Sequence, residues 1–209
     1  PARHKPAAAP VIQEAPSAAA SLKSGTQPAR PIPWKGVLVI FFVAAMQGWS
    51  SQNIAIFIPK FVADLGQPAS VYGFLLPLFT IGGVIGNLLS AAYADKFGRS
   101  RVIFVVMLAA VLPLVGLSLA GYSIWMYILL PLCGAAISAA YPVIVTLAQR
   151  LVPGGMGMVT GLSLGIVFSS GALGTMFSGA LADAVGFPPV FLLTAGLALL
   201  GGLVALARA

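Results

Sequence analysis

Charged residues are scarce in this chain. Only 7% of its 209 residues are Asp, Glu, Lys or Arg, whereas 59% are hydrophobic, which excludes a water-soluble globule of this size. The chain has one cysteine, Cys133, so an intrachain disulfide is excluded, and its one histidine, His4, lies far from it in the sequence. A metal site of the usual His and Cys type is unsupported. We therefore expect a membrane protein without a bound metal or other cofactor.

The chain consists largely of long apolar runs. From Gly36 onward, six hydrophobic segments follow one another, at about 36–61, 71–94, 102–120, 123–148, 156–182 and 188–207. Each can cross the roughly 30 Å of hydrocarbon in a bilayer as a helix, which takes about 20 residues. Strands of a transmembrane barrel would alternate over about ten residues, and these runs do not. The sequence predicts an all-α polytopic membrane protein with six transmembrane helices.

The first 34 residues differ from the rest of the chain. They are rich in Pro, Ala and Ser and have no apolar period, so we expect residues 1–34 to form a disordered linker before a helical bundle over 35–209. They also lack an initiating Met and the apolar core of a signal peptide. The chain is therefore expected to be part of a longer protein.

The basic residues indicate an orientation. With six spans, ten of the eleven Lys and Arg residues fall on the side of the linker, and only Lys60 falls on the other side. Because basic residues concentrate in cytoplasmic loops, both ends of this chain are predicted to be cytoplasmic. The basic residues form no surface stripe, so membrane lipid is expected as a partner and nucleic acid is not.

A stretch of the sequence recurs 88 residues downstream. Residues 80–98 align without gaps on 168–186, with seven identities in nineteen positions, including Asp95 with Asp183 and Gly98 with Gly186. Three helices separate the copies, so the copies face opposite sides of the membrane, as in the inverted repeats of secondary transporters. We expect two three-helix units, at about 36–121 and 122–209.

Small residues recur at every fourth position in the second and fifth segments. They include Gly82, Gly86 and Ser90 in the second, and Gly161, Gly165, Gly174 and Ser178 in the fifth. Such stripes let helix backbones approach closely. Static helix packing and a smooth surface along which two bundles rock both require small residues, so the sequence leaves both interpretations open.

A charged turn separates the second segment from the third. The stretch "AAYADKFGRSR" resembles the loop motif of the major facilitator superfamily, in which Gly, three residues, Asp, a basic residue, any residue and Gly precede further basic residues. The matching residues are Asp95, Lys96, Gly98, Arg99 and Arg101, and the departures are Ala91 and Ser100. The stretch "VTLAQRLVPGGMGMVTGLSLGIVFSSGALG" is similar to bacterial drug exporters of the fosmidomycin-resistance type.

The resemblance implies a fold and a partner. It implies that the chain is the carboxyl-terminal half of a twelve-helix transporter in the bacterial inner membrane, joined by the linker to an amino-terminal six-helix half. In the family this loop latches the two halves on the cytoplasmic side. A carboxylate at a helix N-terminus gains about 0.3 to 1 kcal/mol, so Asp95 is expected to hold a helix of the other half, with Arg99 completing the charge network. A solvated turn that only sets topology is the alternative.

Polar residues interrupt the first hydrophobic segment at mid-span. Gln47, Ser50, Asn53 and Phe57 share about a third of the helix circumference. In the fourth segment, Ser138 and Tyr141 precede Pro142 at the repeat-related position. We expect these six residues to line a substrate cavity, with interhelical hydrogen bonding as the alternative for the first segment. No Asp, Glu, Lys, Arg or His lies centrally in a span, so a proton carrier is expected in the other half.

These patterns favour a secondary active transporter. We expect efflux of a small drug-like or metabolite substrate by proton antiport, with an importer of the same fold or a non-transporting scaffold as alternatives. The stretch "GLSLG" matches the pattern of a nucleophile elbow. That motif requires a strand, a helix and a histidine base, whereas Ser163 lies in an apolar helix, so we do not expect an enzyme.

Overall fold

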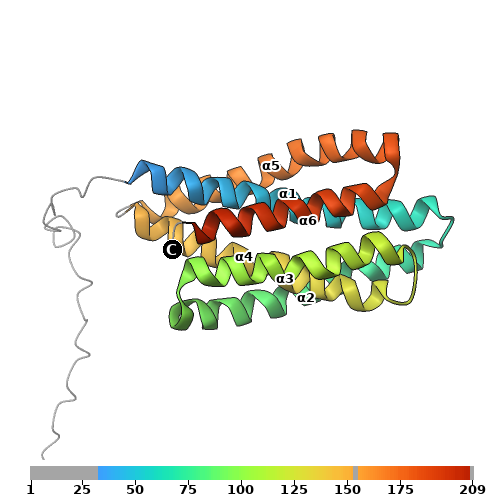
Figure 1. Ribbon diagram of the computed structural model, residues 1–209, viewed down its shortest axis with the longest axis horizontal. Coiled ribbons are helices and arrows are strands. Elements are labelled where there is room, and N and C mark those ends of the chain that lie inside the picture. Colours follow the sequence, from blue (N-terminus) through green and yellow to red (C-terminus); the bar gives the residue numbers. More distant parts are fainter. Residues whose placement is uncertain (1–32, 153–154, 208–209) are drawn as a thin grey trace, which may run out of the picture. The chain divides into compact units, whose positions relative to one another are not determined.

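The computed structural model describes residues 33–152 and 155–207, and this part of the chain folds into six helices (Figure 1). They are α1 (Trp34–Asp64), α2 (Ala69–Phe97), α3 (Arg99–Ala120), α4 (Met126–Leu151), α5 (Met156–Val185) and α6 (Phe187–Leu206). All six are long and apolar enough to cross a membrane. The predicted all-α membrane fold is confirmed, with helix ends within three residues of the predicted segments. Of the predicted linker, residues 1–32 lie outside the described residues, and α1 begins at Trp34.

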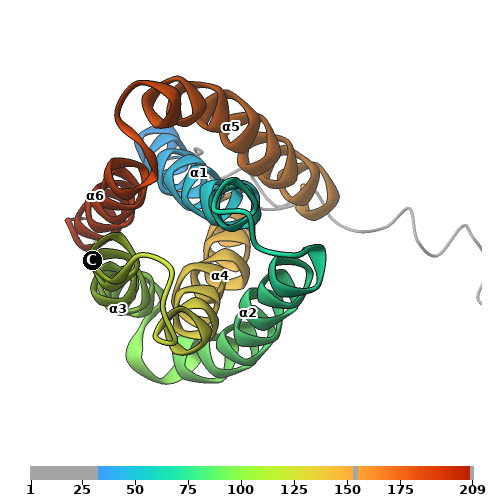
Figure 2. The same ribbon diagram turned by 90° about the vertical axis from the view of Figure 1, so that its right-hand side faces the viewer.

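The helices pair in a pattern that follows the predicted repeat. Successive helices run in opposite directions along the bundle (Figure 1), and α1 and α4 lie toward its middle when it is viewed from one end (Figure 2). The principal contacts join α1 with α5, α4 with α2, and α3 with α6. Since α1 and α4 open the two three-helix units, each opening helix packs against the second helix of the other unit. The contacts that the two units make with each other are therefore equivalent in this respect.

Two glycines make the sharpest turns of the bundle. Gly98 alone separates α2 from α3, and Gly186 alone separates α5 from α6. Their φ angles are +89° and +87°, a region that L side chains rarely adopt. The two residues are equivalent in the sequence repeat, so a glycine with a positive φ angle follows the second helix of both units.

The interior consists of two apolar clusters. One includes Leu75, Leu114 and Phe191, and the other includes Ile103 and Ile144. Along α1, the residues that join the second cluster end at Ala44, and those that join the first begin at Ile54. The polar stretch of α1 therefore lies between the two clusters. The outer surface is also apolar, as expected for contact with lipid: Leu112 is 79% exposed and Leu119 is 81% exposed.

Candidate functional site

A cavity of about 240 Å³ lies beside the polar stretch of α1. Four helices form its wall, whereas α3 and α6 contribute no lining residue. The polar part of the wall comes from α1, α2 and α4: Gln47, Gly48, Ser51, Gln52, Asn87, Ser138 and Tyr141. The part from α5 is apolar: Leu164, Val167 and Phe168. The wall therefore combines polar and apolar residues, and none of these lining residues carries a charge.

The structure places three of the six predicted lining residues in this wall. Gln47 comes from α1, and Ser138 and Tyr141 come from α4. The side chain of Gln47 also reaches α4, where its Nε2 lies 3.4 Å from the carbonyl oxygen of Ile137. The repeat-related helices therefore meet at the cavity, as the sequence indicated. The role of these residues in binding a substrate stays a prediction.

The other three predicted residues lie outside this cavity. Ser50, Asn53 and Phe57 are buried between helices and do not line the cavity. Asn53 donates a hydrogen bond of 3.0 Å to the Thr194 hydroxyl of α6, which is the interhelical bonding that the sequence left open. Ser50 donates to its own helix, and Phe57 belongs to an apolar cluster. The polar residues of α1 therefore lie on two faces of the helix, and hydropathy does not distinguish these faces.

Seven lining residues were missed: the three apolar residues of α5, and four residues of α1 and α2. Gly48, Ser51 and Gln52 belong to the same polar stretch of α1 but lie on the neighbouring face of the helix. Asn87 lies in α2, next to one of the glycines of the repeated stretch. A lone amide in an apolar span is costly unless it is hydrogen-bonded or lines a cavity. This energetic cost is the signal in the sequence by which Asn87 could have been found.

Two hydrogen-bond acceptors at the cavity have no partner. The side-chain oxygens of Gln47 and Asn87 are buried and accept no hydrogen bond from the described residues. Leaving such an atom unpaired costs about 1 to 3 kcal/mol. Both oxygens are closed off from solvent in this conformation, although other atoms of the two side chains line the cavity. The uncharged polar residues and the apolar α5 residues of the wall are suited to an uncharged molecule with an apolar part.

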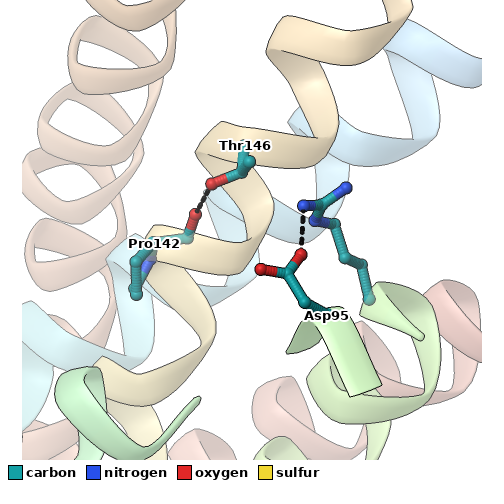
Figure 3. A network of polar contacts seen from close by, with 4 residues as sticks. Asp95, Pro142 and Thr146 are labelled. Carbon is teal, nitrogen blue, oxygen red and sulfur yellow. Dashed lines mark hydrogen bonds and ion pairs between the residues drawn. The ribbon is translucent and has the colours of Figure 1, made fainter. Parts of the chain in front are cut away.

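The backbone of α4 is interrupted next to the cavity. Pro142 has no N–H, so the carbonyl of Ser138, one turn earlier, has no helical partner. One turn later, the Thr146 hydroxyl donates a hydrogen bond of 2.6 Å to the Pro142 carbonyl (Figure 3). Ser138 in the cavity wall can therefore accept a hydrogen bond through its backbone carbonyl as well as through its side chain.

Small residues bring the helices of the cavity wall together. A Cβ added to Gly82 or Gly86 would overlap the α4 backbone at Pro131 or Ala135, and one added to Gly174 would overlap the ring of Trp49 on α1. The equivalent serines of the two stripes are both buried, at 3% exposure for Ser90 and 0% for Ser178. Ser178 also accepts a hydrogen bond of 3.0 Å from the Trp49 indole.

Two of the predicted packing glycines behave differently. Gly161 and Gly165 are exposed, and an added Cβ at either position would meet no atom within 4 Å in the described part of the chain. No other helix of the described bundle packs on this pair, and their role in helix packing stays a prediction. Glycine spacing alone does not reveal which helix face is covered. The two glycines leave a smooth, uncovered strip on α5.

The charged turn is organised by an ion pair across Gly98. Arg99 donates to the Asp95 carboxylate at 2.7 Å (Figure 3), and the side chain of Arg99 is 12% exposed whereas that of Asp95 is 75% exposed. Lys96 places its ammonium 5.5 Å from the ring centroid of Phe97. Arg101 is exposed at the start of α3. Most of the Asp95 carboxylate is accessible, and its role as a latch stays a prediction.

The serine of the "GLSLG" pattern lies inside α5. Ser163 is 1% exposed, and its hydroxyl donates a hydrogen bond of 2.7 Å to the Val159 carbonyl of the same helix. The strand-to-helix turn on which such a nucleophile stands is replaced here by continuous helix. The hydroxyl is therefore bonded to its own helix backbone rather than presented at a turn.

Several known transporters are similar to this chain. A transporter of the same superfamily from Bacillus subtilis, whose function is uncharacterized, is 39% identical over 65% of this chain and 32% of its own length. The cyanate transport protein of Escherichia coli is 33% identical over 78% of this chain and 43% of its own length. The fosmidomycin resistance protein of Escherichia coli is 32% identical over 59% of this chain and 30% of its own length.

The chain thus spans less than half the length of these curated relatives. The match to the family as a whole is more extensive. The sequence profile of the Major Facilitator Superfamily matches residues 40–209, which include all six helices apart from the first turns of α1. Six apolar helices that could each cross a membrane, together with this match, show that the chain is a multi-pass membrane protein and belongs to the major facilitator superfamily.

Proposed function

We propose that this chain forms one half of a secondary active transporter that carries a small, uncharged, partly apolar molecule by alternating access. The observation that carries the proposal is the cavity between α1, α2, α4 and α5, whose wall combines uncharged polar residues, among them Gln47 and Asn87, with apolar residues of α5. Sites for small molecules are typically apolar with a few placed polar groups. The membrane fold and the superfamily supply the setting for transport.

The partner of this bundle is the amino-terminal six-helix half of the same polypeptide. Gly161 and Gly165 on α5 support this proposal, since they form an uncovered strip of small residues in the described bundle. The same helix supplies Leu164 and Phe168 to the cavity, so a second bundle that covered this strip would also close the cavity. The strip would then serve as the surface along which the halves rock.

The turn of Asp95, Lys96, Gly98, Arg99 and Arg101 is proposed to latch the two halves on the cytoplasmic side. The exposed carboxylate of Asp95 supports this role, because it can accept further hydrogen bonds besides the one from Arg99. A helix N-terminus of the other half would offer unpaired N–H groups to such a carboxylate.

The distribution of basic residues supports an orientation. In the described residues, Lys35, Lys96, Arg99, Arg101 and Arg150 lie at the end of the bundle where α1 begins, and Lys60 lies at the other end. We propose that the first of these ends faces the cytoplasm of a bacterial cell, with the bundle in the inner membrane.

Export by proton antiport is the proposed direction and coupling. The similarity to a fosmidomycin resistance protein supports export. The acidic residues of the described chain, Asp64, Asp95 and Asp183, lie within the last turns of α1, α2 and α5, so the carboxylate that carries the proton is assigned to the other half. Import is the second candidate. The similar cyanate transport protein is named for transport of its compound and not for resistance to it.

Transport by membrane vesicles tests the proposal. The complete protein would be expressed in an efflux-deficient bacterium, and everted vesicles would be assayed for proton-dependent accumulation of a panel of neutral, amphipathic antibiotics and dyes. We expect Gln47→Leu and Asn87→Leu to reduce accumulation of the transported compound severalfold, each at normal expression. Ser50→Ala is the matched control, because the Ser50 hydroxyl only bonds its own helix.

The possible results separate the alternatives. Uptake by right-side-out vesicles alone would show an importer. No flux of any compound in either kind of vesicle would favour a scaffold. The assignment of the cavity would be contradicted if the Gln47 and Asn87 variants transported normally while Ser50→Ala impaired transport.

A further inference from the structure

A second hollow, larger and far more apolar than the cavity, lies on the outside of α2, α3 and α4. This groove has a volume of about 810 Å³. Its floor is made of small residues, which explains its depth: Gly86, Ala135 and Ala139. Larger apolar side chains form its sides. The substrate proposal makes no use of it, since the two hollows share no lining residue.

The groove runs along the helices from one end of the bundle. On α3, its lining residues Arg101, Val105, Ala109 and Leu112 follow one another at helical spacing along a single face. The lining on α3 ends at Pro113, and the twelve steps from Arg101 at 1.5 Å rise make the groove about 18 Å long on this helix. The hydrocarbon core of a bilayer is about 30 Å thick, so about 15 Å belongs to each leaflet. The groove therefore spans one leaflet, from its surface to the middle of the membrane.

The end of the groove at the membrane surface is basic. Arg101 lines it, and so does Phe97, whose ring centroid lies 5.5 Å from the Lys96 ammonium. The charge of Arg99 is offset by its ion pair with Asp95. In the described part of the chain, Arg101 and Lys96 have no acidic partner, so the groove opens beside two uncompensated positive charges.

We propose that this groove is a binding site for an anionic phospholipid. One acyl chain lies along α3 in the groove, and the phosphate-bearing headgroup lies against Arg101 and Lys96. Tyr93 lines the same end of the groove, where amphipathic aromatic rings commonly lie at headgroup level. The apolar length, the leaflet depth and the charge at one end together match a phospholipid, and none of them depends on the transport proposal.

Native mass spectrometry of the complete protein in detergent tests the site. The protein is titrated with palmitoyl-oleoyl phosphatidylglycerol and with the phosphatidylcholine of the same acyl chains. We expect the anionic lipid to bind more tightly, and Arg101→Gln to weaken it about fivefold, the typical attraction of one basic side chain for an anionic membrane. Arg101→Lys should keep the affinity. Arg150→Gln is the matched control, because Arg150 lies at the same end of the bundle outside the groove.

A second pair of variants tests the apolar part. Ala109→Trp should fill the groove and abolish this binding for both lipids, whereas Leu108→Trp, on the adjacent residue outside the groove, should not. Both residues are exposed, so neither substitution disturbs the core of the bundle. Equal lipid binding by these two variants would overturn the proposal, as would equal effects of Arg101→Gln and Arg150→Gln. The proposal would also be overturned if the protein formed a dimer that Ala109→Trp dissociated and Leu108→Trp did not. The groove would then be the binding site of a second copy of the chain.

Discussion

Replacing Gly82 by Ala should separate two helices that now touch through their backbones. A Cβ at this position would overlap the carbonyl group and Cα of Pro131 on α4, and backbone atoms cannot rotate away as a side chain can. Relief therefore requires α2 and α4 to move apart. Overpacking of this kind costs typically about 1 to 3 kcal/mol. Against it stands the helix propensity of Ala, which exceeds that of Gly by about 1 kcal/mol.

The same helix offers a matched control. Gly73 also lies within α2, but a Cβ added there would meet nothing within 4 Å in the described residues. Only the propensity gain acts at this position, so Gly73→Ala should leave the stability unchanged or raise it by up to about 1 kcal/mol. Gly82→Ala should instead lower it by up to about 2 kcal/mol, the difference between the packing cost and the propensity gain.

The assay is thermal unfolding of the complete protein in detergent, followed by tryptophan fluorescence. We expect the Tm of Gly82→Ala to fall below that of the unsubstituted protein and the Tm of Gly73→Ala to stay level or rise. Gly86→Ala should behave like Gly82→Ala, because its Cβ would meet the backbone of Ala135. If the Tm values at positions 73 and 82 changed equally, close backbone packing of α2 on α4 would be refuted.

Three further predictions concern other contacts. A double-mutant cycle with Asn53→Leu and Thr194→Val should give a coupling free energy of about 0.6 to 1.7 kcal/mol in reversible unfolding, and a coupling of zero would deny the hydrogen bond between α1 and α6. Gly98→Ala and Gly186→Ala should each destabilise the protein by about 1 to 3 kcal/mol, measured as a lower Tm, because both residues have a positive φ; an effect at only one of them would break the equivalence of the two turns. Asp95→Asn should cripple transport by the complete protein in vesicles while expression and orientation stay normal, whereas unimpaired transport would reject the latch.

The fold was predictable from the sequence because the bilayer imposes a strong length requirement. A span must be apolar for about 20 residues, so hydropathy alone locates the helices. The errors lie at their ends: α1 extends three residues beyond 61, and α2 three beyond 94. These ends carry Lys60 with Asp64, and Asp95 with Lys96. A helix continues past the hydrocarbon as long as its backbone bonds are made, whatever the polarity of its side chains.

The candidate site was less predictable, for a reason visible in α1. Gln47 and Asn53 are both amides in an apolar helix, yet one lines the cavity and the other bonds Thr194 of α6. Both placements lower the cost of a polar group in the membrane, so composition does not choose between them. The choice depends on which helix lies opposite. Asn53 faces α6, and that neighbour is known only from the three-dimensional packing.

The repeat explains why the cavity lies between four helices and not six. Its glycines hold α2 against α4 and α5 against α1, which are the four helices that line the cavity. Gly83 shows how close the connection is, because a Cβ there would lie 2.8 Å from the Ser138 hydroxyl in the cavity wall. Its repeat partner, Gly171, would similarly press on Gln52, another lining residue. At these two positions the residues that fix helix packing touch the residues that shape the cavity, so a change in how the helices pack must also change what the cavity accepts.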